Sequence, residues 1–307
     1  MQDIRPVPTV SPGLRILRVV GISLAYLLLC ALLATLLAYP AHQLTHGVIS
    51  IRAGVSRGSL ILLVLGLVPW CRFLGLTRRD VGITGGWRAF PRGFGLGVLM
   101  LGLHSGVLLL LGIRVSHALP WLDVSHGLRS IGQALGVAFL VAVVEEILFR
   151  GVMLAAFSRA AGRVTAVLLS ATYYALLHFF RADPRLDIGE PGWSSGFNVL
   201  QNALQHLLAA PVDALLALFF AGLLLALVRL QAAMGLVYCM GLHAGWVFVI
   251  RLAKPLTDAV PTGEWSFLVG SYDGFTGYLA AGWMGVLSLI TGMVFYRNSR
   301  RDRIAGS

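Results

Sequence analysis

Residues 143–151 read VVEEILFRG, which places two adjacent acids and one arginine inside an apolar run that extends from residue 134 to residue 157. If this run crosses a lipid bilayer, the acids lie near the middle of the span, where an ionised side chain is costly unless it is paired or hydrated. Successive residues of an α-helix differ by about 100° in direction, so Glu145 and Glu146 face different sides of the helix. Glu146 can pair with Arg150, four residues along the same helix surface. Glu145 is therefore predicted to face another segment of the chain.

The composition is that of a membrane protein. Of the 307 residues, 57% are hydrophobic and only 12% are charged, and the mean hydropathy is +0.82. These values predict an all-α polytopic membrane protein. The net charge of +11 comes mainly from arginines at the ends of apolar runs, which is typical of membrane orientation and lipid contact and not of nucleic-acid binding. Cys30, Cys71 and Cys239 have neither metal-like nor paired spacing, so we expect small buried hydrophobic side chains.

The apolar runs are long enough for about eight transmembrane helices, which would enclose an intramembrane polar cavity. They lie near residues 17–39, 58–73, 93–113, 130–158, 162–180, 212–230, 233–252 and 276–296. A single transmembrane domain is predicted over residues 14–297, between a tail of residues 1–13 and a basic tail of residues 298–307. Residues 40–57 are predicted to form a polar connection. The segment Phe197–Leu208 is amphipathic and is expected at the membrane interface.

The distribution of arginine predicts the orientation. Eight spans would leave both termini on one side of the membrane. The Arg-rich loop at residues 77–92, the turn that contains Arg159 and Arg163, and the C-terminal tail are predicted to be cytoplasmic, because basic residues favour that side. The acid-bearing loops after the fifth and seventh spans would then lie outside. We therefore expect an integral protein of the bacterial inner (plasma) membrane with both termini in the cytoplasm.

Two histidines lie deep within other predicted spans, His178 in the fifth and His243 in the seventh. Measured from the predicted cytoplasmic ends of their spans, Glu145, His178 and His243 lie roughly 20, 24 and 15 Å deep. One carboxylate and two imidazoles are thus predicted to converge in one cavity. A single intramembrane histidine is often only an interhelical hydrogen-bonding group, and His104 is expected to have such a structural role. The ion pair of Glu146 and Arg150 is also expected to be structural.

The three converging groups suit peptide-bond hydrolysis. A glutamate shielded from bulk water, with an imidazole beside it, can deprotonate a water molecule without a cofactor, while the second histidine donates to the developing oxyanion. Glu145, His178 and His243 could instead hold a divalent metal such as zinc, and the sequence leaves both versions open. His-Glu-x-x-His, an intramembrane Gly-x-Ser-Gly and a pair of intramembrane aspartates are absent from the sequence. The glycines of residues 93–97 are more typical of helix packing than of nucleotide binding.

The order of these groups resembles that of a known family. Glu145-Glu146-x-x-x-Arg150 is followed by an aromatic residue four positions before a histidine (Tyr174 and His178), and by His243 in a later span. This order resembles the type II CAAX prenyl endopeptidases, also called the CPBP or Abi family, which include Rce1-like proteases. The resemblance covers residues 130–250. It implies an eight-helix fold and a glutamate-type intramembrane endopeptidase. In that family, the residues that correspond to Glu145 and His178 activate water, and the one that corresponds to His243 stabilises the oxyanion.

The sequence departs from the family's motifs at two positions. Tyr174 stands where phenylalanine is usual, and Val247 stands where asparagine or aspartate is usual. Valine can neither donate a hydrogen bond nor ligate a metal, so half of the implied oxyanion site is either missing or supplied by another residue. Asn198, Asn202 and Gln205 are candidates to supply it.

Two other functions fit the same residues. A non-proteolytic member of the family, with an immunity or scaffold role, would tolerate Val247. A proton-coupled carrier would also use buried glutamate and histidine, but the sequence has neither paired broken helices nor an inverted repeat. For a protease, the expected partner is a membrane-associated peptide or protein, such as a prenylated segment or a C-terminal tail. The sequence does not indicate the oligomeric state.

Overall fold

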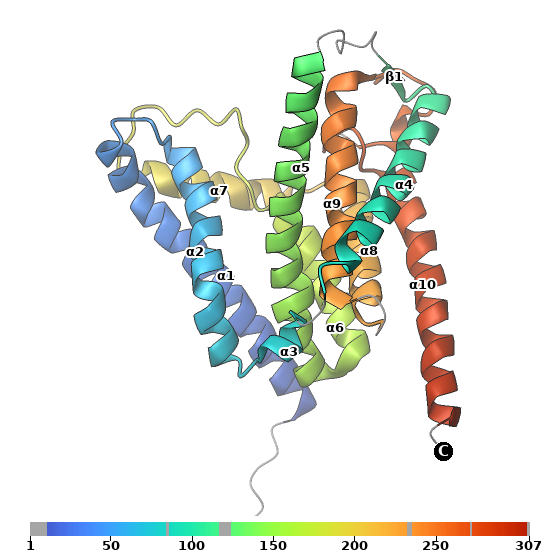
Figure 1. Ribbon diagram of the computed structural model, residues 1–307. Coiled ribbons are helices and arrows are strands. Elements are labelled where there is room, and N and C mark those ends of the chain that lie inside the picture. The colour runs from blue at the N-terminus through green and yellow to red at the C-terminus, as the bar shows by residue number, and fades with distance from the viewer. Residues whose placement is uncertain (1–10, 84–85, 117–123, 232–234, 271, 306–307) are drawn as a thin grey trace, which may run out of the picture.

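The computed structural model describes residues 11–83, 86–116, 124–231, 235–270 and 272–305, and this part of the chain is almost entirely helical (Figure 1). The long helices are α1 (Pro12–Leu44), α2 (Ile51–Phe73), α4 (Ala89–Leu110), α5 (Val124–Glu146), α6 (Leu154–Phe179), α8 (Val212–Arg229), α9 (Gly235–Ala253) and α10 (Tyr278–Ala305). The shorter elements are the helices α3 (Arg78–Val81) and α7 (Ser195–Leu208), the π-helix η1 (Ile147–Met153), the 3₁₀ turns η2 (Lys254–Leu256) and η3 (Ser266–Leu268), and the strands β1 (Arg114–Ser116) and β2 (Thr257–Ala259), which pair antiparallel. The predicted all-α membrane fold is confirmed.

Six helices are long and apolar enough to cross a membrane, so the predicted number of eight spans is not established. These six are α1, α2, α4, α8, α10 and α9 together with η2. The predicted fourth and fifth spans correspond to α5, η1 and α6, which carry the charged residues of the central stretch. Helix α6 breaks at Gly162, whose φ of 78° and ψ of 169° are accessible in practice only to glycine. The second half of α6 then runs back along η1, where Ser170 bonds to Phe149.

The boundaries of the first two helices differ from the prediction. The polar connection predicted at residues 40–57 is wrong, because α1 continues to Leu44 and α2 begins at Ile51. The side chain of Ser50 caps α2 by accepting a hydrogen bond from the backbone N–H of Ala53 at 3.3 Å. Ile51 is buried in a small cluster with residues of α1 and α7, and this packing stabilises the early start of α2 despite its polar residues. The first ten residues of the predicted N-terminal tail lie outside the described residues.

Helices α4 and α9 pack with their backbones in close contact. Gly93 and Gly97 of α4 face Gly241 and Gly245 of α9, and a Cβ atom at any of the four would overlap backbone atoms of the other helix. Small residues spaced four apart are the usual device for such close approach in a membrane. The predicted packing role of the glycines in residues 93–97 is confirmed for Gly93 and Gly97. This contact fixes α9, which carries His243.

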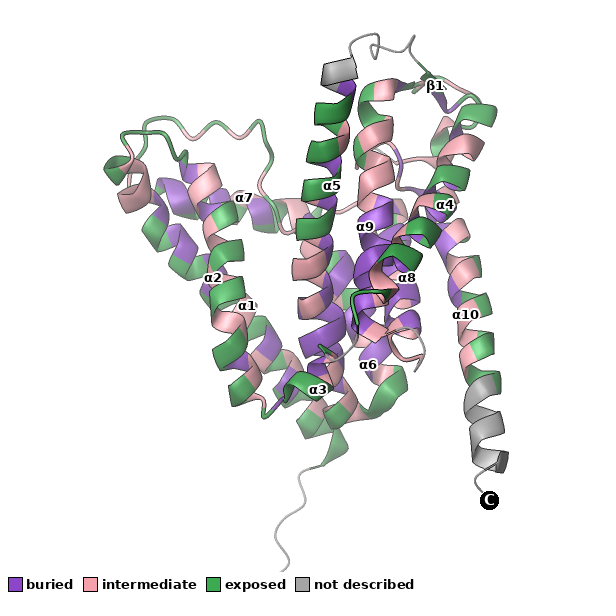
Figure 2. Cartoon of the chain, viewed as in Figure 1, coloured by how far each residue is buried: buried purple, intermediate pink, exposed green. Residues whose placement is uncertain are grey.

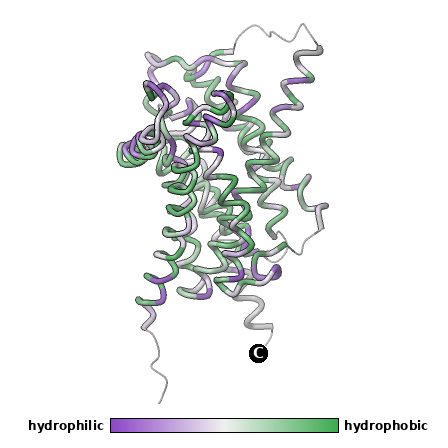
Figure 3. The backbone as a smooth tube through the Cα atoms, turned by 90° about the vertical axis from the view of Figure 1, so that its left-hand side faces the viewer, coloured by the Kyte–Doolittle hydropathy of each residue, from purple (hydrophilic) through white to green (hydrophobic). Residues whose placement is uncertain are grey.

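The helices form a bundle whose most buried part lies around α6, α8 and α9 (Figure 2). Helix α7 runs across the direction of the others, beside α1 and α2 (Figure 1). Hydrophobic residues dominate the middle of the bundle, and hydrophilic residues gather towards its two ends (Figure 3). We call the end where α1 begins and α10 finishes the termini end, and the end that carries β1 and β2 the ribbon end (Figure 1).

Candidate active site

The site begins where α5 changes into a π-helix. Glu145 and Glu146 are the last two residues of α5, and η1 follows directly at Ile147. The hydroxyl of Ser170 on α6 donates to the carbonyl oxygen of Phe149 at 3.0 Å, so a carbonyl of the widened helix finds a partner outside the helix. The sequence predicted one regular helix through this stretch, which is wrong at η1. Short π-helical segments inside α-helices occur frequently at functional sites.

Arg150 is buried at the centre of the bundle. Its Nη1 lies 3.3 Å from Oε1 of Glu146, and both side chains are fully buried. Its Nη2 donates to the carbonyl oxygen of Gly222 on α8 at 3.3 Å. Its guanidinium lies 4.2 Å from the centre of the Tyr174 ring, which is cation–π geometry. Arg150 therefore joins η1, α6 and α8, and the predicted pairing with Glu146 is present.

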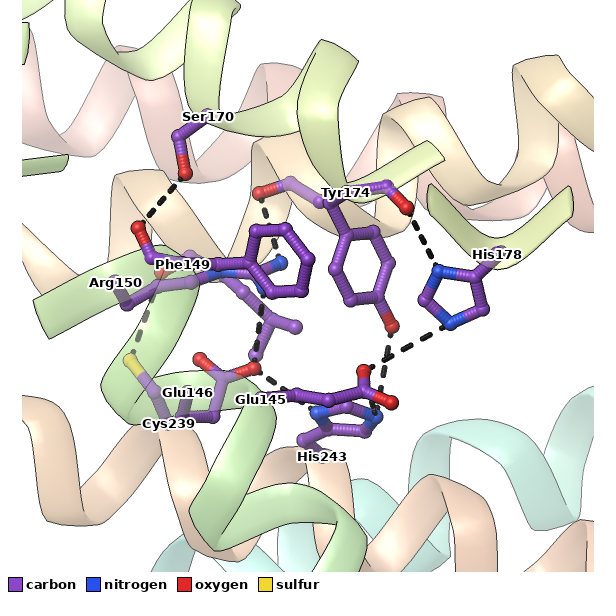
Figure 4. A network of polar contacts seen from close by, with 11 residues as sticks. Glu145, Glu146, Phe149, Arg150, Ser170, Tyr174, His178, Cys239 and His243 are labelled. Carbon is purple, nitrogen blue, oxygen red and sulfur yellow. Dashed lines mark hydrogen bonds and ion pairs between the residues drawn. The ribbon is translucent and has the colours of Figure 1, made fainter. Parts of the chain in front are cut away.

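His243 is held by Glu146 (Figure 4). Its Nδ1 lies 2.9 Å from Oε1 of Glu146, so Nδ1–H donates to the carboxylate and Nε2 points the other way. Nε2 lies 3.8 Å from Oε2 of Glu145. It also lies 3.5 Å from the hydroxyl of Tyr174. The sequence assigned Glu146 to Arg150 alone, since helical spacing indicates partners on the same helix and says nothing of a contact to α9.

His178 is held by its own helix. Its Nδ1 lies 2.7 Å from the carbonyl oxygen of Tyr174, one turn earlier on α6. Because a carbonyl only accepts, Nδ1 carries the proton, and Nε2 of the neutral ring keeps a free lone pair. That Nε2 lies 3.8 Å from Oε2 of Glu145. The structure thus brings together Glu145, His178 and His243, the three residues that the sequence singled out.

The side chains of the two glutamates differ in how far they are exposed. The side chain of Glu146 is completely buried, whereas those of Glu145 and His178 are 27% and 20% exposed. Oε2 of Glu145 has no hydrogen-bond partner within the described part of the chain. The 3.8 Å separation from each histidine is too long for a direct hydrogen bond, and Oε2 itself is buried. A water between Glu145 and an imidazole therefore requires these side chains to move slightly apart.

A cavity of about 220 Å³ adjoins the two histidines. Tyr174, His178, His243, Trp246 and Val247 line it near the site, and Arg251, Asp273 and Thr276 line it towards the ribbon end. Most of the remaining wall is apolar and comes from α4, α8 and α10.

The candidates proposed to compensate for Val247 do not line this cavity. Asn198 and Gln205 are exposed on α7. The side-chain oxygen of Asn202 accepts from the backbone N–H of Asp183 at 2.8 Å, so it holds the loop before α7. The hydroxyl of Tyr174 is instead the polar group beside His243, and the departure from phenylalanine at this position was its signal in the sequence.

His104 also lines the cavity, and its Nε2 lies 3.3 Å from the carbonyl oxygen of Phe275.

The geometry supports a zinc site formed by Glu145, His178 and His243 less well than it supports a site without a metal. No group of three or more histidine, cysteine, aspartate or glutamate side chains with the spacing of a metal site occurs within the described residues. A zinc ion needs ligand atoms at about 2.0–2.2 Å, so Glu145 and both imidazoles would have to move closer together. We therefore derive no catalytic step through a metal.

Comparison with known proteins gave a match to one family model. Residues 127–249 match the family model described as type II CAAX prenyl endopeptidase Rce1-like. Comparisons with curated proteins and with solved structures gave no match. The matched region contains Glu145, Glu146, Arg150, Tyr174, His178 and His243. Over residues 127–249, this membrane protein is therefore similar to the Rce1-like type II CAAX prenyl endopeptidase family.

Proposed function

We propose that the protein is an intramembrane endopeptidase that hydrolyses a peptide bond with a water activated by Glu145 and His178. The observation that carries this proposal is the position of a single carboxylate oxygen, Oε2 of Glu145, at 3.8 Å from Nε2 of both His178 and His243. Similarity to a protease family supports the reaction class. The family match by itself identifies neither the activity nor the substrate of this chain.

The reaction begins with the water between Glu145 and His178. The water gives a proton to Glu145 while its oxygen bonds to the substrate's carbonyl carbon. The carbonyl oxygen becomes an oxyanion, which Nε2–H of protonated His243 and the hydroxyl of Tyr174 stabilise. Glu145 then passes the proton to the amide nitrogen as the C–N bond breaks, which releases an amine and a carboxylic acid.

Glu146 and Arg150 position His243 and balance charge. With His243 protonated, Glu145 and Glu146 carry two negative charges and Arg150 and His243 carry two positive charges, so the cluster is neutral. Neutrality matters here because an unbalanced charge away from water is costly. The 2.9 Å contact with Glu146 also orients Nε2 of His243 towards the reacting carbonyl.

The substrate would be a membrane-associated peptide or protein. The side chain of Glu145 is partly exposed, and the mostly apolar cavity beside His178 and His243 would receive a neighbouring apolar side chain of the substrate. A prenylated segment or a C-terminal tail meets this requirement. For the location we propose the bacterial inner membrane with both termini in the cytoplasm, because the arginines gather at the termini end.

The test compares the termini of membrane proteins in cells that carry wild-type protein, Glu145→Gln or Glu190→Gln. Glu190→Gln is the matched control, since Glu190 is an exposed loop acid. We expect a set of termini to fall by about a hundredfold or more with Glu145→Gln, the usual effect of losing a general base, and to persist with Glu190→Gln. The proposal is refuted if all three cell lines, at equal protein abundance, give the same termini.

Val247 supports a second candidate, a non-proteolytic member of the family with an immunity or scaffold role. The residue lines the cavity one turn from His243 and presents only methyl groups there. On this alternative, the phenotype of Glu145→Gln cells would match wild type even though the protein is required. Zinc binding by Glu145, His178 and His243 is tested by measuring the metal content of the purified protein.

A further inference from the structure

A second pocket lies at the termini end of the bundle and shares one residue, Arg150, with the polar network of the candidate active site. Its volume is about 220 Å³, and it lies between α3, the turn of α6 at Gly162 and the end of α8. The charged residues that line it are Arg150, Arg159, Arg163, Arg229 and Asp80. Four arginines and one acid thus line one small pocket.

Two of the four cations are already balanced, because Arg150 pairs with Glu146 and Arg159 pairs with Asp80. Nη2 of Arg159 lies 2.7 Å from Oδ2 of Asp80, and its Nη1 donates to the carbonyl oxygen of Gly75 at 2.7 Å. Hydrogen bonds from Thr77 and the Arg159 guanidinium lower the pKa of Asp80 to about 2, so this acid stays ionised at neutral pH. Arg159 and Asp80 therefore form a rim with little net charge.

The other arginines leave positive charge without a partner. Arg163 is exposed, and neither it nor Arg229 forms an ion pair within the described residues. Nε of Arg229 is buried and has no hydrogen-bond partner there. The Arg229 guanidinium packs so closely on Gly82, at the end of α3, that a Cβ at Gly82 would overlap it. This close packing holds Arg229 in place, unlike a free surface arginine.

The inner wall of the pocket is Arg150. This residue is only 1% exposed, and its Nε is a second buried donor without a hydrogen-bond partner in the described chain. Buried donors in native proteins are nearly always satisfied, so two unsatisfied guanidinium nitrogens around one cationic pocket indicate a missing acceptor. Arginine forks match phosphate oxygens well, because they donate several hydrogen bonds in one plane.

We propose that this pocket binds a phosphate group, with Arg163 and Arg229 as its main contacts and Arg150 as its floor. The headgroup of an anionic phospholipid and free inorganic phosphate share this chemistry. The pocket lies where the helices end, at the depth of lipid headgroups if the bundle spans the membrane, and anionic lipid is attracted to basic protein surfaces. This proposal does not rest on the proposed proteolysis, although Arg150 also pairs with Glu146 of the candidate active site.

The experiment uses the full chain purified in neutral detergent. Native mass spectrometry measures retention of dioleoyl phosphatidylglycerol and dioleoyl phosphatidylcholine, each titrated separately. The pocket variant is Arg163→Gln/Arg229→Gln. The matched control, Arg72→Gln/Arg92→Gln, removes the same charge from exposed residues of the same end that do not line the pocket.

We expect wild-type protein to prefer phosphatidylglycerol, the pocket variant to bind it about tenfold more weakly or worse, and the control to match wild type. Competition by inorganic phosphate then distinguishes the two possible ligands. If phosphate displaces the lipid, the pocket binds both free phosphate and lipid headgroups. If it does not, the pocket is specific for the lipid. Equal binding of the two lipids, or equal losses in both double variants, overturns the proposal. If the double variant does not fold, exposed Arg163→Gln is compared with Arg92→Gln and read in the same way.

Discussion

The hydroxyl of Tyr174 adds a hydrogen-bond donor beside His243, 3.5 Å from its Nε2. Phenylalanine, the residue expected from the family's motif, would fill the same space without this donor. Val247 lines the same cavity and cannot donate. We therefore infer that tyrosine at position 174 supplies the oxyanion contact that position 247 lacks.

Tyr174→Phe should lower kcat by about 10- to 100-fold and change KM little, because the lost contact forms only in the transition state. Steady-state cleavage of a substrate found by comparing termini measures both constants. Tyr173→Phe is the control, since the hydroxyl of Tyr173 donates to the carbonyl oxygen of Val20 at 2.9 Å and belongs to helix packing. Equal loss of kcat in both variants would speak against a catalytic hydroxyl at Tyr174.

Val247→Asn offers a rescue of the same contact. An asparagine one turn from His243 on α9 would place an amide donor in the cavity, so adding Val247→Asn to Tyr174→Phe should restore about tenfold or more of the lost kcat. Val247→Leu in the same background should restore nothing, because it adds volume without a donor. Identical rates for the asparagine and leucine variants would show that position 247 does not face the oxyanion.

The sequence could predict much of the site at this scale. Ionisable groups are rare inside membranes, so Glu145, His178 and His243 could be identified as candidates. Their similar depths in three predicted spans indicated that the side chains meet. The contact between Glu146 and His243 could not be predicted, because depth along a helix carries no information on the direction of a side chain. The π-helical turn after Glu146 further changes those directions from the regular helical pattern.

At the scale of elements, the glycine contact between α4 and α9 determines where His243 lies. Gly241→Leu should lower the stability of the folded protein by at least about 3 kcal/mol, because a side chain there must displace the backbone of α4. Thermal unfolding in detergent measures the change. Gly102→Leu is the matched control, since Gly102 lies on the exposed face of α4 with no atom within 4 Å of an added Cβ. Similar unfolding temperatures for the two variants would contradict the role of this contact.

The helices themselves were largely predictable, since long apolar runs have few alternatives in a membrane. The residues at which the helices begin and end were harder to predict. The polar residues at the start of α2 indicated a loop, yet burial of Ile51 against α1 and α7 extends the helix by about two turns. Tertiary packing, which local composition does not report, decides such boundaries.

At the scale of the whole molecule, charge is distributed asymmetrically. Helix α3 and the turn at Gly162 bring arginines to the termini end, whereas the loops that contain Asp183, Asp187 and Asp273 lie towards the other end. The candidate active site lies in the interior of the bundle, because Glu145 is about 32 Å along α5 from its start at Val124 and His243 is about 12 Å along α9 from its start at Gly235. The cavity beside the histidines extends from there towards the ribbon end.

The positive-inside rule then predicts that the termini end faces the cytoplasm and that the ribbon end faces the outside. Single cysteines test this orientation in a Cys71→Ser background, because Cys30 and Cys239 are buried. In intact cells, a membrane-impermeant maleimide should label Glu264→Cys, in the exposed loop after β2, and should label Arg79→Cys on α3 only after the membrane is permeabilised. The opposite labelling would invert this orientation and contradict the prediction.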